Sequence, residues 1–152
     1  MNDTLVEATK NFVKEQLKHA EGGHDWFHTE RVFKTAKKIS EKEEVDSLVV
    51  QLAALLHDIA DPKFHNGDEE IGPKTAQEFL ASQDLDPVRT DHIANILRHM
   101  SFKNSLDKGQ PKFNSLELQV VQDADRLDAI GAIGIARTFN YGGFKNRPMY
   151  DP

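Results

Sequence analysis

The sequence predicts an all-α fold, built as one compact bundle of helices. Apolar residues recur at intervals of three and four along much of the chain, which is the spacing of one helix face. No stretch shows the sustained alternation of period two that is typical of a half-buried strand. The 152 residues are enough for one sizeable core but few for two. We therefore expect a single domain over residues 1–152.

The first three helices are predicted from their caps and their apolar spacing. One should run from about residue 3 to 19, where a glycine pair follows. A second should begin at a cap at or near Asp25 and fade around residue 44. A third, capped by Asp46 or Ser47, should run to about residue 59. The third is the most apolar, so we expect it to be the central helix.

The second half of the chain alternates predicted helices with polar loops. The dipeptide Asp86-Pro87 is typical of a cap followed by proline at the first helical position. Residues 129–139 continue the apolar pattern, and residues 141–152 are expected to be irregular. Helices are expected at 73–81, 87–99 and 115–128, with loops at 62–72 and 102–114.

The composition limits the classes of function. The chain has no cysteine, which excludes disulfides and thiolate metal sites and leaves His, Asp and Glu as the strong metal ligands. A net charge of -6 opposes nonspecific binding to nucleic acid. The most apolar stretch, 48–60, is too short and too polar to span a membrane, and the N-terminal residues lack the pattern of a signal peptide. We expect a cytoplasmic protein that binds neither nucleic acid nor membranes.

Three polar clusters interrupt the apolar pattern. His57-Asp58 directly follows the run LAALL in the central helix, where unpaired ionisable groups are costly. The segment DADRLD at 123–128 brings carboxylates into another core helix, but it lacks the ligands and glycine of a calcium loop. Within it, a solvated helix face suits Asp128 better than Asp125. His24 and His28 lie between aromatic residues near a helix start. Each cluster alone fits a hydrogen-bonded structural group as well as a binding site.

Taken together, the strings HDWFHTERV, ALLHDIAD and QDADRLDAIGAIGIAR resemble the HD superfamily of metal-dependent phosphohydrolases, and in particular small bacterial HD hydrolases. The resemblance covers nearly the whole chain. It implies a divalent ion bound between helices by His28, His57, Asp58 and Asp125. The family pattern implies Asp125 because the corresponding acid precedes a basic residue and lies three before another acid, and Asp123 is the alternative.

These residue types suit a hydrolytic metal site. Two neutral imidazoles and two carboxylates neutralise a divalent ion and leave positions for water and a phosphate oxygen. We expect Mn²⁺, with Fe²⁺, Co²⁺, Mg²⁺ and Zn²⁺ as alternatives. The resemblance implies a small phosphorylated substrate, a nucleotide, and most specifically a nucleoside triphosphate cleaved to monophosphate and pyrophosphate. A nucleoside monophosphatase or another phosphodiesterase of the superfamily would use the same metal chemistry.

Arg31, Lys63 and Asp61 are the expected catalytic residues. Arg31 lies about one turn after His28, and Lys63 follows the His-Asp pair, so both are candidate donors to phosphate. Asp61 follows the pair by less than one turn and is the first candidate to orient water or protonate a leaving group. Further candidates are Glu69 or Glu70 for the same role, Arg98, Lys103 and Arg126 as phosphate donors, and His24, His92 and His99 as additional site residues.

Two other classes of function stay open from the sequence. A nucleotide or metal sensor would bind ligand without turnover, and a purely structural module would not respond to metal. Proteins that this sequence resembles usually continue with more helices beyond the segment GGFKNRPMYDP. We therefore expect that the single HD domain either lacks C-terminal helices or is a short form. An oligomer is compatible with the sequence.

Overall fold

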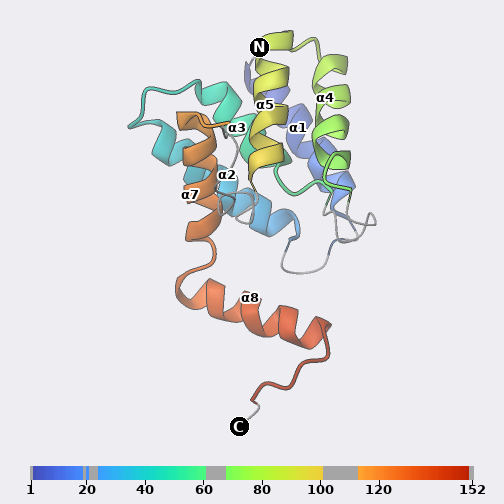
Figure 1. The fold of residues 1–152 in the computed structure, drawn as a ribbon, viewed down its shortest axis with the longest axis vertical. Helices are drawn as coiled ribbons and strands as arrows, with labels where there is room; N and C mark the ends of the chain where they lie inside the picture. Colours follow the sequence, from blue (N-terminus) through green and yellow to red (C-terminus); the bar gives the residue numbers. More distant parts are fainter. Residues whose placement is uncertain (1, 19, 21–23, 61–67, 101–112, 151–152) are drawn as a thin grey trace.

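The computed structural model describes residues 2–18, 20, 24–60, 68–100 and 113–150. Its described residues form helices and no strand, which confirms the predicted all-α fold. Helices α1 to α5 and α7 gather in one bundle, and α8 lies apart at one end (Figure 1). The helices are α1 (Asn2–Gln16), α2 (Trp26–Ser40), α3 (Ser47–Leu56), α4 (Ile71–Ser82), α5 (Pro87–His99), α7 (Leu116–Leu127) and α8 (Gly131–Phe144).

Several helices begin at side-chain caps of the kind that the sequence predicts. Asp25 accepts a hydrogen bond from the His28 backbone N–H at the start of α2, and Asp46 caps α3 in the same way. Asp86 caps α5, whose first residue is a proline. Ser115 caps α7. These caps satisfy backbone donors that a helix leaves unpaired in its first turn.

Helix α3 forms the centre of the core. Eight of its ten residues are buried, and it packs against α1, α2, α5 and α7. Helix α2 also packs against α7, so α2, α3 and α7 contact one another pairwise. The C-terminal ends of α3 and α7 and the first turn of α2 can therefore contribute side chains to one place.

Some predicted boundaries are wrong. Helix α2 ends at Ser40 instead of near residue 44, because the following EKEE run offers no apolar side chain to continue its buried face. Helix α3 ends at Leu56 instead of near residue 59, since the His57 imidazole binds the Ala54 carbonyl, an acceptor left at the helix end.

The C-terminal part is more helical than predicted. Residues 128–130 separate α7 from α8, whose first residue, Gly131, has φ +69°, a conformation that glycine adopts without strain. Helix α8 then continues to Phe144, so residues 141–144 are helical instead of irregular. Within the part of the chain that the structure describes, no helix has the length and apolar character needed to cross a membrane.

Candidate metal centre

Three helices bring four predicted metal ligands together. His28 lies in the first turn of α2, His57 and Asp58 directly follow α3, and Asp125 lies in the last turn of α7. Because these helices pack against one another, side chains 30 and 97 positions from His28 meet beside it. The candidate ligand set is thus brought together by tertiary packing, without a local metal-binding motif.

The four side chains converge on one small volume. His28 Nε2 lies 3.5 Å from Asp58 Oδ2 and 3.4 Å from Asp125 Oδ1. His57 Nε2 lies 3.5 Å and 3.8 Å from the same two oxygens. The two Nε2 atoms are 3.3 Å apart. Two ligands at about 2.1 Å from an ion are about 3.4 Å apart at a tetrahedral angle and further apart at wider angles. The ligand atoms of His28, His57 and Asp125 all lie within 4.8 Å of one another, so these three can share one coordination sphere, and Asp58 lies beside both imidazoles.

The hydrogen bonds of the two imidazoles leave both Nε2 atoms available. His57 Nδ1 donates to the Ala54 carbonyl at 2.9 Å, because a carbonyl can only accept. His28 Nδ1 donates to Asp128 Oδ2 at 2.7 Å. In its neutral form each ring therefore carries its lone pair on Nε2, and the two Nε2 atoms face each other at 3.3 Å, where a proton or a metal ion can lie between them. A divalent cation fits this arrangement.

Burial divides the site into a closed and an open side. The side chains of His28 and His57 are 1% and 2% exposed, whereas those of Asp58 and Asp125 are 25% and 37% exposed. The imidazoles thus form the floor in the core, and the carboxylates line the side that solvent reaches. A small anionic ligand would approach from the carboxylate side.

The carboxylates control the protonation of the site. Burial would lower the pKa of His28, but Asp125, Asp58 and Asp128 outweigh it and raise that pKa to about 9. Burial would raise the pKa of Asp58, yet the nearby imidazoles of His57, His28 and His24 hold it below its ordinary value. The pKa of Asp125 is lowered for the same reason by His28 and His57. Both carboxylates are ionised at neutral pH, as metal ligands must be.

The prediction for Asp128 is wrong, because this residue is buried and does not belong to a solvated face. Its side chain is 6% exposed and accepts hydrogen bonds from His28, Arg31 and Arg137. Asp125, three residues earlier, is the more exposed of the two. The sequence signal that was available is the i, i+3 spacing, which puts both acids on one side of α7.

The comparisons with known proteins identify the family. Residues 26–130 match the HD domain family. This chain belongs to the HD family. It is 37% identical to YpgQ of Bacillus subtilis over 147 residues, covering 95% of this chain and 70% of YpgQ. It is 30% identical to protein L803 of Acanthamoeba polyphaga mimivirus over 160 residues, covering 96% of this chain and 65% of L803. The chain thus spans about two thirds of the length of these relatives.

Solved structures of similar proteins share the fold. The crystal structure of Bacillus subtilis YpgQ in complex with ADP has a TM-score of 0.81 at 35% identity and covers 100% of this chain and 73% of that one. A Bacillus thuringiensis HD-superfamily hydrolase has a TM-score of 0.77 at 42% identity, covering 100% of this chain and 72% of the other. The chain is thus similar in sequence and fold to HD-superfamily hydrolases.

Of the three expected catalytic residues, only Arg31 lies among the residues that the structure describes. Arg31 binds Asp128 through two hydrogen bonds, from Nε to Oδ1 at 2.6 Å and from Nη2 to Oδ2 at 2.9 Å. Asp61 and Lys63 lie outside the described residues, as does Lys103. Asp123, the alternative ligand, is exposed and lies 3.9 Å from Arg126.

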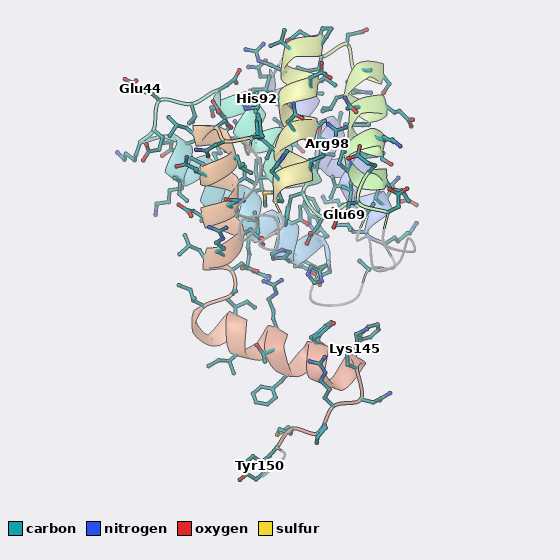
Figure 2. All side chains as sticks on the ribbon, in the orientation of Figure 1. Glu44, Glu69, His92, Arg98, Lys145 and Tyr150 are labelled. Carbon is teal, nitrogen blue, oxygen red and sulfur yellow. The ribbon has the colours of Figure 1, made fainter. Side chains whose placement is uncertain are left out.

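The additional histidines separate into two groups. The His24 ring meets the His28 ring edge-on, with 6.0 Å between the ring centroids, so His24 lies next to the candidate metal centre. His92 lies beside the beginning of α7, where Nε2 is 3.0 Å from Ser115 Oγ and 3.6 Å from Glu117 Oε2 (Figure 2). The His99 ring packs on Phe113, and its Nδ1 donates to the Asn95 carbonyl. Neither is among the ligand atoms that converge at the site.

Two further candidates form an ion pair with each other. Arg98 Nε lies 3.0 Å from Glu70 Oε1, which joins the end of α5 to the residue before α4. Glu69 lies on the same side of the bundle (Figure 2). The Arg98 guanidinium lowers the pKa of Glu70. Glu70 is therefore an ionised ion-pair partner in this structure.

Proposed function

We propose that this HD-family hydrolase cleaves nucleotides, most specifically a nucleoside triphosphate to its monophosphate and pyrophosphate, with Mn²⁺ as its ion. The observation that carries the proposal is the convergence of four side chains, in which His28 Nε2 and His57 Nε2 lie 3.3 Å from each other and 3.4 to 3.8 Å from Asp58 Oδ2 and Asp125 Oδ1. Two imidazoles and two carboxylates are a nitrogen and oxygen donor set for Mn²⁺ and its neighbours in the transition series.

A bound divalent ion would lower the pKa of a water molecule and polarise a phosphoryl oxygen. The protein's own residues prepare that chemistry. The Ala54 carbonyl and Asp128 hold the two imidazoles with Nε2 directed at the other ligands. Asp58 and Asp125 supply two negative charges on the open side, which balance a divalent cation.

The phosphate-binding and acid-base roles are assigned by position. Arg31 uses Nε and Nη2 on Asp128, so we assign its remaining nitrogen, Nη1, to a phosphate oxygen of the substrate. Asp61 and Lys63 follow His57-Asp58 closely in the chain. We assign Asp61 to orienting water or protonating the leaving group, and Lys63 to a phosphate oxygen.

The nucleotide class rests on the relative YpgQ, whose crystal structure was determined in complex with ADP. A triphosphate as substrate, a single domain and a cytoplasmic location are parts of the same proposal. A small phosphorylated ligand also suits the chain's negative charge, which disfavours a nucleic acid.

The test is the release of phosphate and pyrophosphate from a panel of nucleoside mono-, di- and triphosphates with Mn²⁺. Wild-type protein is compared with His57→Ala and Asp58→Ala, and with His92→Ala and Asp123→Asn as matched controls away from the ligand set. We expect pyrophosphate from triphosphates, lost after chelation and in both ligand variants but kept in both controls. Release of phosphate instead would favour a phosphatase.

Absence of turnover with every nucleotide, in a protein shown to bind Mn²⁺, would contradict the proposal and favour a sensor. A protein whose melting temperature does not change with Mn²⁺ would favour a structural module, because a ligand bound only by the folded state raises the apparent stability.

A further inference from the structure

Asp128 is the buried carboxylate that the proposed reaction does not use. It follows the last residue of α7 and lies three positions after Asp125. Its side chain is almost inaccessible to solvent, so each of its hydrogen bonds must come from the protein. A buried ionised carboxylate is costly unless several donors compensate it.

Four hydrogen bonds from three residues hold this carboxylate. Arg31 binds both oxygens, at 2.6 Å and 2.9 Å. His28 Nδ1 donates to Oδ2 at 2.7 Å, and Arg137 Nη1 donates to the same oxygen at 3.2 Å. Arg137 also donates to the Asp128 backbone carbonyl at 3.2 Å. Because guanidinium nitrogens only donate, both oxygens of Asp128 are hydrogen-bond acceptors in this arrangement.

The bond to His28 has a defined consequence for the metal ligand. A carboxylate whose two oxygens both accept requires a proton on Nδ1, so when the His28 ring is neutral its lone pair is on Nε2. The short Nδ1 to Oδ2 bond also opposes rotation of the ring away from His57, Asp58 and Asp125. A hydrogen bond of this kind fixes the tautomer of a ligating histidine and raises its basicity.

We propose that Asp128 is a positioning residue, which holds metal ligand His28 in its binding tautomer and orientation and is itself held by Arg31 from α2 and Arg137 from α8. The inference rests on the proposed metal site. It also gives α8 a role: the helix lies apart from the bundle in Figure 1, yet its Arg137 reaches the carboxylate that orients His28.

The first test is the affinity for Mn²⁺, measured by titration calorimetry without nucleotide. The substitution Asp128→Asn keeps the size of the side chain and removes its charge. The matched control is Asp123→Asn, which removes an exposed acid from the same helix. Loss of such a supporting partner typically weakens metal binding about 10- to 100-fold, so we expect that loss in Asp128→Asn and none in the control. Circular dichroism of the metal-free proteins establishes that both variants fold.

The second test does not depend on a variant. In the Zn²⁺-loaded wild-type protein, long-range ¹H–¹⁵N spectra should show His28 with a proton on Nδ1 and the metal on Nε2. Metal binding through Nδ1 would overturn the proposal, as would unchanged Mn²⁺ affinity in folded Asp128→Asn. A wild-type protein that binds no Mn²⁺ would refute the metal site itself. Normal metal binding without nucleotide turnover would refute only the proposed reaction.

Discussion

Mn²⁺ binding at pH 7 should release close to one proton from the protein, and His28 should be its source. Folding raises the pKa of His28 from its ordinary 6.5 to about 9 in the metal-free protein. A group with that pKa is about 99% protonated at pH 7, whereas a metal ligand must be neutral. Apparent affinity for Mn²⁺ should therefore rise about tenfold per pH unit between about pH 7 and pH 9 and then level off.

The assay is titration calorimetry at pH 7 in two buffers with different ionisation enthalpies. The difference between the observed enthalpies gives the number of protons released. Asp123→Asn serves as a control that should release the same number. Release of no proton at pH 7, together with an affinity that does not change up to about pH 9, would refute the electrostatic account of the site.

The same pKa shift predicts how the metal-free fold responds to pH. A group whose pKa is raised by folding stabilises the protein in its protonated form. The contribution of His28 should be complete below about pH 6.5 and lost as the pH rises through about 9. Urea unfolding with a chelator should thus give a smaller free energy of unfolding at high pH, and bound Mn²⁺ should remove this loss.

Three further predictions concern the fold, each measured by denaturant unfolding or circular dichroism. Leu52→Ala, at a fully buried position of α3, should lower the free energy of unfolding by about 2 to 5 kcal/mol. Val88→Ala, at an exposed position, should change it by less than about 0.5 kcal/mol, and equal effects would contradict the assigned core. Asp46→Ala should cost about 1 kcal/mol, because Asp46 caps α3, and an unchanged midpoint would show that the cap is not formed. Gly134→Ala should disrupt the start of α8, since its Cβ would lie 2.2 Å from the Ala129 carbonyl oxygen. Gly142→Ala meets no atom within 4 Å and should add helix content. A higher helix content in Gly134→Ala than in Gly142→Ala would contradict the turn before α8.

The positions of most helices could be predicted because their signals are local. Asp25, Asp46, Asp86 and Ser115 each cap the helix that follows them, and all four are recognisable from their neighbours in sequence. The end of α3 was less predictable. It depends on His57 turning its imidazole to the Ala54 carbonyl, and apolar spacing carries no information on that bond.

The site was predictable only in part. Apolar context made His57-Asp58 conspicuous, but the complete set of four ligands came from the resemblance to the HD superfamily. Asp128 shows the physical limit most clearly. Its partners His28 and Arg31 lie about 100 residues earlier in the chain, so the segment DADRLD carries no signal of its burial beyond the i, i+3 spacing from Asp125. The turn that separates α8 from α7 was missed because residues 129–139 keep a helical pattern across it.

The most direct test of the central claim is a crystal structure of the protein with Mn²⁺, with anomalous diffraction measured near the manganese absorption edge. The account predicts one anomalous peak between His28 Nε2, His57 Nε2, Asp58 Oδ2 and Asp125 Oδ1, at about 2.0 to 2.3 Å from each atom. A peak elsewhere, for example at His92 and Glu117, or no peak at the four ligands in a crystal saturated with Mn²⁺, would contradict it.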